Sequence, residues 1–364
     1  MQLRPSSSHM WTQCFAQPRF AALSPEEPEG DPSREGTCAA WVAEMVLKGE
    51  VKKAADLEGT THANGWLVTA DMIDHIHEYV MNVMGHGGTV HTERKVRLNT
   101  LIAGTPDAYA ILSKEGVLYV DDLKYGFMIV EPYRNPQISI YAGAILRRLT
   151  VNGVTVNRVV IGVYQPRGFH PAGVYRTWEV YPEDLMKFVH EIEAAGEACQ
   201  NPAAEATPGS HCEYCPAAAH CVALGFTTYR NFDAIRDSRH AVMTPEALSA
   251  ELEFLDVSEK MLKARRSAIR AESVARMKNG EIVPGWHLER PLGDRQFKVD
   301  EMTIRALTGK DPYKPREMKS PAMLEKEGVK PVVVNALSTR PMRPPTLKKL
   351  PKDYYNQLFT AKGS

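Results

Sequence analysis

The sequence predicts an α/β protein in which a mixed β-sheet is flanked by helices. The first half of the chain reads, in order, as helix, helix, three strands, helix, two strands and helix. A strand that is followed by a helix and another strand favours such a sheet. Apolar residues make up 43% and charged residues 24% of the 364 residues, and this balance excludes a disordered, collagen-like or coiled-coil chain.

Composition also narrows the class of protein. No apolar run approaches the roughly 20 residues that a membrane helix needs, and the first residues lack the apolar core of a signal peptide. Basic and acidic residues both total 44, so the zero net charge argues against coating nucleic acid by bulk charge. Six cysteines without an export signal favour a reducing, cytoplasmic location, where metal binding or catalysis is more common than disulfides.

Two amphipathic helices are expected first. Residues 33–50 have apolar residues at helical spacing, with Ser33 as the cap and Gly49 near the end. Residues 69–88 repeat this pattern, with Thr69 as the cap and glycines at the end.

Strands follow, because the next runs are rich in β-branched and aromatic residues and have turn-rich flanks. The expected strands cover residues 90–98, 101–112, 116–126, 156–166 and 173–182, with helices at 135–149 and 182–200.

The rest of the chain begins with one long helix over residues 244–280, with Thr244 as the cap and Gly280 at the end. Its second half is basic, and residues 338–355 have little periodicity and are expected to form an extended, basic tail. The tail cations are Arg340, Arg343, Lys348, Lys349, Lys352 and Lys362. We therefore divide the chain into a cysteine-bearing core (1–230), a long-helix extension (231–285) and a C-terminal extension (286–364).

A carboxylate–lysine group stands out in the expected sheet. Asp107 ends one strand, and Asp122 and Lys124 point to the same face of the next strand because side chains alternate. Two carboxylates and a backbone carbonyl, here that of Leu123, suit Mg²⁺, which would activate water while Lys124 stabilises developing charge. A salt bridge at a sheet edge explains the D-x-K triplet alone equally well. Asp121 competes as a ligand, but only Asp122 has the D-x-K spacing.

Three cysteines form a second candidate site. Cys212, Cys215 and Cys221 follow a C-x2-C-x5-C pattern, which can wrap three thiolates around a metal centre and leaves one position for a distant cysteine. A zinc ion and a [4Fe–4S] cluster both remain open on this chemistry.

These motifs resemble those of the PD-(D/E)XK nuclease superfamily, in its RecB/AddB-like branch. The pattern is G-x-x-D, then a strand with (D/E)-x-K, then a helix with Q-x-x-x-Y, whose last two residues are Gln137 and Tyr141, one turn apart. The resemblance implies a restriction-endonuclease-like core. It also implies metal ligands at Asp107 and Asp122, a catalytic Lys124, and an additional metal contact from Glu44.

One departure from the family pattern matters. Many relatives carry a histidine four residues before that glutamate, where this chain has Ala40. An alternative therefore stays open, namely an iron–sulfur, DNA-binding protein of the same fold with weak catalysis.

The resemblance also bears on the cysteines. One branch of these nucleases holds a [4Fe–4S] cluster with one cysteine upstream of the core and three downstream. This implies Cys14 as the fourth ligand, with Cys38 as its rival and Cys199 as an ordinary thiol. The cluster would join distant parts of the chain, which otherwise costs loop-closure entropy. A zinc-bound scaffold protein is the second alternative.

The nearly full-length resemblance extends to phage and prophage proteins of this class that lack an assigned function. It implies an Mg²⁺- or Mn²⁺-dependent deoxyribonuclease, an exonuclease, in phage DNA recombination or processing in the cytoplasm of a bacterial host cell. The implied partners are DNA and a phage single-strand annealing protein.

Overall fold

The computed structural model describes most of the chain and divides it into two compact units. The described residues are 1–24, 30–237, 244–289, 296–310, 312–314, 317–318, 320–326, 328–339 and 346–349. The units comprise residues 1–265 and 266–364. The expected tail cations Arg340, Arg343, Lys352 and Lys362 lie outside the described residues.

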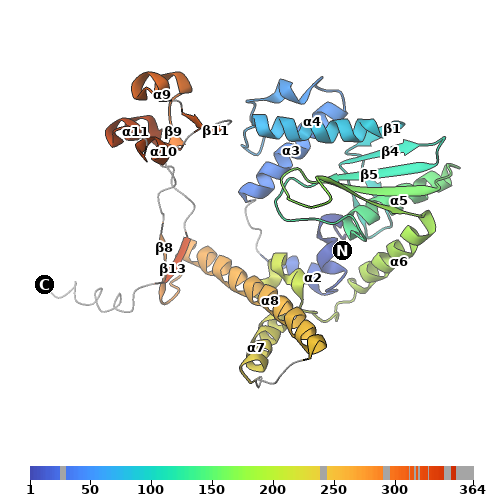
Figure 1. Ribbon diagram of the computed structural model, residues 1–364. Helices are drawn as coiled ribbons and strands as arrows, with labels where there is room; N and C mark the ends of the chain where they lie inside the picture. The colour runs from blue at the N-terminus through green and yellow to red at the C-terminus, as the bar shows by residue number, and fades with distance from the viewer. Residues whose placement is uncertain are drawn as a thin grey trace. The chain divides into compact units, whose positions relative to one another are not determined.

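A five-stranded mixed sheet forms the centre of the first unit (Figure 1). Its strand order is β1-β4-β5-β6-β7, in which β5 and β6 are parallel and the other neighbours are antiparallel. The strands are β1 (Thr89–Thr92), β4 (Ala108–Leu112), β5 (Val117–Leu123), β6 (Arg158–Tyr164) and β7 (Tyr175–Val180). The α/β class and the mixed sheet predicted from the sequence are confirmed.

Helices cover both faces of this sheet, as predicted (Figure 1). The helices α3 (Asp31–Leu47) and α4 (Ala70–Gly85) pack on one face, and α5 (Pro136–Val151) and α6 (Pro182–Ala198) pack on the other. Alternation along β5 divides its side chains between them: Leu118 and Val120 join the α5–α6 core, and Leu123 joins the α3–α4 core. The central strand is therefore buried on both sides.

Two expected strands are interrupted. The run 90–98 splits into β1 and β2 (Val96–Arg97), and the run 101–112 splits into β3 (Ala103–Gly104) and β4. The short strands β2 and β3 pair only with each other among the described strands, so the chain changes partner between them and the main sheet. Glu93 takes a left-handed conformation at the first break, with φ of 48°. Pro106, which has no N–H to donate to a ladder, marks the second break.

The N-terminal segment is part of the folded core. Trp11 is fully buried in the α5–α6 core, and its Nε1 donates a 3.0 Å hydrogen bond to the carbonyl of Arg4. The Leu3 amide donates to the carbonyl of Leu101 at 2.8 Å. The segment comprises η1 (Pro5–Ser7), α1 (Ser8–Trp11) and α2 (Gln17–Ala21). Outside this segment, the 3-10 turn η2 (Ala54–Leu57) lies between α3 and α4.

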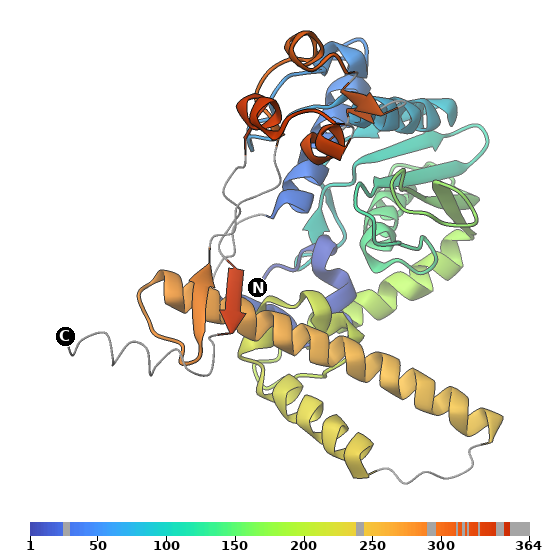
Figure 2. The ribbon, with the colours of Figure 1, turned by 60° about the vertical axis from the view of Figure 1, so that its left-hand side comes forward.

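The segment after the sheet returns to this N-terminal segment. Here η3 contacts α1 and η4 contacts α2, and Figure 2 shows these parts side by side. The elements are η3 (Ser210–Tyr214), η4 (Pro216–Ala219), α7 (Val222–Asp237) and α8 (Pro245–Lys278). Two segments that are almost 200 residues apart, such as Cys14 and Thr207, are thereby joined.

The second unit has a small core of its own, formed by α9 (Glu301–Thr308), α10 (Pro321–Lys326) and α11 (Pro331–Leu337) around Ile304, Leu324 and Val334. Its paired strands are β8 (Trp286–Glu289) with β13 (Thr346–Lys349), β9 (Gln296–Phe297) with β12 (Ser338–Thr339), and β10 (Tyr313–Lys314) with β11 (Glu317–Met318). Part of the expected extended tail is thus paired in strands. Of the helices described, none is long and apolar enough to span a bilayer.

A glycine on the central sheet provides a test of this packing. A Cβ at Gly162 would lie 2.2 Å from Asp121 Oδ1 and 2.7 Å from the Tyr175 ring. We expect Gly162→Ala to lower the free energy of unfolding by about 1–3 kcal/mol, because the crowded core must shift. Denaturant unfolding measures this. The control Gly36→Ala, in α3 with open space around it, should not destabilise the fold because alanine favours a helix. Equal stability of the two variants would contradict the packing described.

Candidate functional site

Asp122, Lys124 and Gln137 contact one another at the end of β5. The Lys124 ammonium lies 2.8 Å from Asp122 Oδ2 and donates a 3.1 Å hydrogen bond to Gln137 Oε1. Gln137 Nε2 in turn donates to Asp122 Oδ1 at 3.2 Å. Asn135 caps α5, and its side-chain oxygen accepts a hydrogen bond from the Gln137 amide. This cap fixes the position of Gln137 in the first turn of the helix. The structure therefore brings together the D-x-K pair and the first residue of the Q-x-x-x-Y motif.

Asp107 lies on the same face as Asp122. The antiparallel register pairs Ala108 with Asp121. The next residues along the two strands, Asp107 and Asp122, therefore also face each other. The Leu123 amide donates a 2.7 Å hydrogen bond to Asp107 Oδ2. Burial, followed by repulsion from Asp122, raises the pKa of Asp107 to about 8. One carboxyl of the pair is thus neutral at pH 7 unless a cation offsets the second charge.

The lysine is held in its charged form. Burial lowers the pKa of Lys124, but the carboxylates of Asp122 and Asp107 raise it by more, so the net pKa lies above its ordinary value. Asp122 is only 2% exposed, and its Oδ2 faces the ammonium of Lys124. An ammonium beside a buried carboxylate oxygen is a compact arrangement for stabilising negative charge.

The donor set fits a hard divalent cation that keeps several waters. No three His, Cys, Asp or Glu side chains of the described residues are arranged to hold a metal ion on their own. Mg²⁺ is commonly bound by one or two carboxylates together with waters and substrate phosphates. Asp107 and Asp122, which face each other on neighbouring strands, match that requirement.

Asp121 points to the opposite face of the sheet. Its Oδ2 lies 2.9 Å from His86 Nε2, and its Oδ1 accepts a 2.8 Å hydrogen bond from the Tyr175 hydroxyl. His86 also stacks on Tyr119, with ring centroids 4.0 Å apart. These partners satisfy Asp121 away from Asp107, so the adjacent aspartates have different environments. The sequence does not predict this pairing, since the partners of His86 come from strands that are distant along the chain.

A further carboxylate near Asp107, that of Glu93, was not predicted from the sequence. Glu44 of α3 forms an ion pair with Lys48, which directly follows that helix. Glu93, at the break between β1 and β2, is half-buried, and its pKa is raised first by burial and then by Glu44. Glu93 also contributes to the raised pKa of Asp107. The Glu93 amide also donates a 3.4 Å hydrogen bond to the carbonyl of Asp107, a contact that the hydrophobic pattern of the expected strand does not predict.

Tyr141 lies one turn after Gln137 and is 5% exposed. Burial raises its pKa well above the ordinary value, and Gln137 hydrogen-bonds its side chain. A Cβ at Gly104, the glycine of G-x-x-D, would lie 2.7 Å from Pro5 and 2.9 Å from the Tyr141 ring. Glycine is thus needed where the N-terminal segment and the tyrosine meet.

The four cysteines expected as ligands line one cavity. Cys14 and Cys212 are buried, and Cys215 and Cys221 are partly exposed. Backbone amides donate to the sulfurs of Cys14, Cys212 and Cys221, each at 3.4 Å. Burial raises the pKa of Cys212 and raises that of Cys215 to about 11, and the other thiols add to both shifts. Four thiolates would repel one another here unless a cationic centre were present.

The remaining cysteines have other surroundings. Cys38 is fully buried in the α3–α4 core, where its nearest polar contact is the carbonyl of Trp66. Cys199 is 4% exposed and its thiol donates to the Trp11 carbonyl at 3.5 Å. Of the two upstream cysteines, the structure therefore places Cys14 at the cavity and Cys38 in the α3–α4 core.

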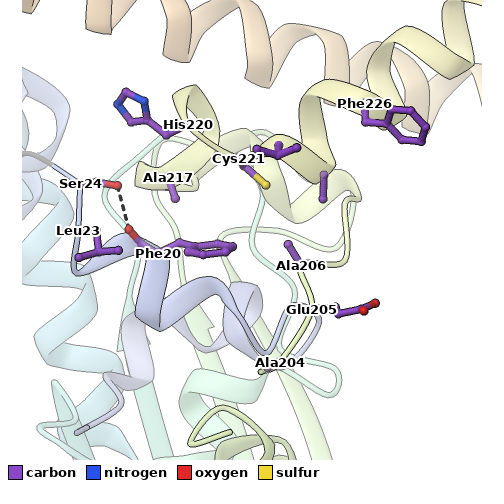
Figure 3. A pocket seen from close by; sticks show the side chains of 12 residues that line it. Phe20, Leu23, Ser24, Ala204, Glu205, Ala206, Ala217, His220, Cys221 and Phe226 are labelled. Carbon is purple, nitrogen blue, oxygen red and sulfur yellow. Dashed lines mark hydrogen bonds between the residues drawn. The ribbon is translucent and has the colours of Figure 1, made fainter. Parts of the chain in front are cut away.

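A wider apolar pocket adjoins the cysteine cavity (Figure 3). Phe20, Ala217 and Cys221 line both, and Leu23 and Phe226 extend the pocket into exposed surface. One proposed ligand, Cys221, therefore borders both the cavity and the pocket.

The comparisons with known proteins give a matching family and 17 matching chains among the solved structures. The model of a family described as "Protein of unknown function (DUF2800)" matches residues 1–350. Among solved structures, a chain from Eubacterium rectale described as "Putative exonuclease" is 11% identical, with a TM-score of 0.36, covering 67% of this chain and 90% of that chain. No curated protein matches.

The raised pKa of Asp107 predicts a pH dependence of stability. Between its unfolded value of 3.8 and its folded value of about 8, the folded state retains a proton that the unfolded state loses. Wild-type stability should therefore fall relative to Asp107→Asn as pH rises through this window. Calorimetric Tm values for both proteins from pH 5 to pH 9 measure the difference. Parallel curves would contradict a raised pKa at this residue.

Proposed function

The chain belongs to the DUF2800 family, and we propose that it is a divalent-metal-dependent deoxyribonuclease of the PD-(D/E)XK type. One observation carries the proposal: Asp107 and Asp122 share one buried face with the ammonium of Lys124, which lies 2.8 Å from Asp122. Two carboxylates and a lysine in this arrangement suit phosphodiester hydrolysis, in which negative charge develops beside the metal.

Each residue has a distinct role in this proposal. Asp107 and Asp122, with the backbone carbonyl of Leu123, would hold Mg²⁺ or Mn²⁺, whose charge would polarise the phosphodiester and acidify a bound water. Lys124 would orient the attacking water or stabilise the developing negative charge. Gln137 keeps the ammonium and Asp122 together through its two hydrogen bonds.

Residues around this centre complete the proposal. Tyr141 supports Gln137 through its hydrogen bond, and Glu44 of α3 would contact the metal directly or through water. The proposed biological setting is exonucleolytic processing of DNA in phage or prophage recombination, alongside a single-strand annealing protein. That setting rests on the sequence resemblance.

We propose further that Cys14, Cys212, Cys215 and Cys221 bind a [4Fe–4S] cluster. Their shared cavity and the amide hydrogen bonds to three sulfurs support this, since such hydrogen bonds are typical of iron–sulfur ligation. The choice of a [4Fe–4S] cluster over a zinc ion rests on the sequence resemblance.

A nuclease assay tests the active site. We expect Asp122→Ala and Lys124→Ala each to lower the rate of DNA cleavage with Mg²⁺ or Mn²⁺ by about 10²-fold or more. Labelled single- and double-stranded DNA would be separated on gels to measure the rates. The matched controls are Asp184→Ala and Lys187→Ala, which disrupt an exposed 2.8 Å ion pair on α6 and should cleave like wild type.

The outcomes separate the alternatives. Equal cleavage by wild type and both site variants would exclude this active site. A wild-type protein that binds DNA tightly without cleaving it would instead be the weakly catalytic, DNA-binding protein of the same fold.

Metal analysis tests the cluster. After anaerobic purification, wild type should be brown and contain iron and sulfide, and Cys14→Ser should lose both because it removes one cavity thiol. The control Cys38→Ser alters a buried thiol of the α3–α4 core and should keep its iron. Iron loss in Cys38→Ser alone would reassign the fourth ligand. Zinc in place of iron would support the scaffold protein.

A further inference from the structure

Two loops beside Lys124 expose an unusual group of large apolar side chains. The first loop, residues 125–131, directly follows Lys124, and the second, residues 165–174, joins β6 to β7. In the first loop, Phe127 is 67% exposed and Met128 is 58% exposed. In the second loop, Phe169 is 91% exposed. Clustered exposed apolar residues at the edge of a polar site commonly mark a binding surface.

Buried polar side chains hold the first loop in place. Gln165 is fully buried, and its Nε2 donates to the carbonyls of Gly126 and Met128 at 2.8 and 2.7 Å. Its Oε1 accepts from the Val130 amide at 3.2 Å and from Arg176 at 2.8 Å. With all four hydrogen-bonding positions of its amide used, Gln165 fixes the loop backbone at alternate residues. The exposed side chains are therefore presented on a well-supported backbone.

The two loops also contact each other. A Cβ at Gly168 would lie 2.9 Å from both Gln165 and the Ile129 side chain, so Gly168 packs directly on the first loop. The guanidinium of Arg167 lies over the rings of Phe127 at 4.2 Å and Tyr125 at 4.9 Å. The two residues that precede Phe169 are thus both seated on the first loop.

Arg167 supplies a guanidinium group that is held in a fixed position at this surface. Glu35 of α3 forms a 2.5 Å ion pair with it, and only 19% of its side chain is exposed. An arginine stacked on an aromatic ring provides both a cation and a flat surface. Lys124 and Arg167, each paired with a carboxylate, thus place two cationic groups beside the loops that carry the exposed rings of Phe127 and Phe169.

We propose that Phe127 and Phe169, with Arg167, form a stacking platform for the unpaired bases of single-stranded DNA entering the site. Non-specific binding of single strands combines base stacking on aromatic side chains with cations that follow the backbone, and this surface has both. Duplex bases are already stacked on each other and gain little from such a platform. The inference rests on the proposed nuclease function and specifies its substrate as a single-stranded end.

Fluorescence anisotropy with a labelled oligothymidylate, without divalent metal so that no cleavage occurs, tests the platform. Phe127→Ala and Phe169→Ala should each weaken binding by about 5- to 150-fold, the range expected for losing one stacked base. Phe127→Trp should retain binding because it preserves a stacking ring. The matched control is Tyr229→Ala, an aromatic residue of α7 that is also 67% exposed and should bind like wild type. Circular dichroism would confirm that all variants are folded.

The outcomes distinguish this inference from the nuclease proposal. Oligothymidylate affinities of both alanine variants equal to that of Tyr229→Ala would overturn the platform, even if wild type cleaves DNA. Binding losses at Phe127 and Phe169 in a wild type that cleaves nothing would support the platform and exclude the nuclease. Wild type that cleaves duplex but binds no oligothymidylate would also overturn the platform.

Discussion

The pairing of Asp107 and Asp122 on the buried face of β5 is the constraint on which the rest of this structure depends. Two carboxylates in a dry environment repel each other, and the single ammonium of Lys124 offsets only one of them. The protein manages this cost with a backbone amide on Asp107, an amide side chain on Asp122 and a proton retained near neutral pH. A divalent cation would offset the same repulsion between the two carboxylates. The repulsion that destabilises the fold is therefore linked to the proposed chemistry.

The N-terminal and cysteine segments support this centre from outside the sheet. Pro5 packs where Gly104 and Tyr141 meet, while the cysteine cavity joins Cys14 to the segment after α6. The Tyr214 hydroxyl, between two of the cysteines, donates a 3.0 Å hydrogen bond to the sulfur of Met128 in the loop after Lys124. The proposed cluster would therefore stabilise the ends of the core and also the loop that carries Phe127.

Much of this organisation could be predicted from the sequence because it depends on local patterns. Helical and strand periodicities gave the element order, and strand alternation placed Asp122 and Lys124 on one face. The break at Glu93 could not be predicted, because it arises when the chain changes strand partners. The same limit applies to His86 and Asp121, whose contact joins residues 35 positions apart. The cysteine spacing indicated three ligands, but it could not by itself choose the distant Cys14.

The most direct test of the central claim is the number of protons released when a divalent cation binds. Titration calorimetry with Mn²⁺ at pH 7, repeated in buffers of different ionisation enthalpy, measures this number. A carboxyl with a pKa of about 8 that becomes a metal ligand must lose its proton. The account predicts release of about one proton per bound ion in wild type and none in Asp107→Asn. Binding without proton release, or equal release by both proteins, would contradict it.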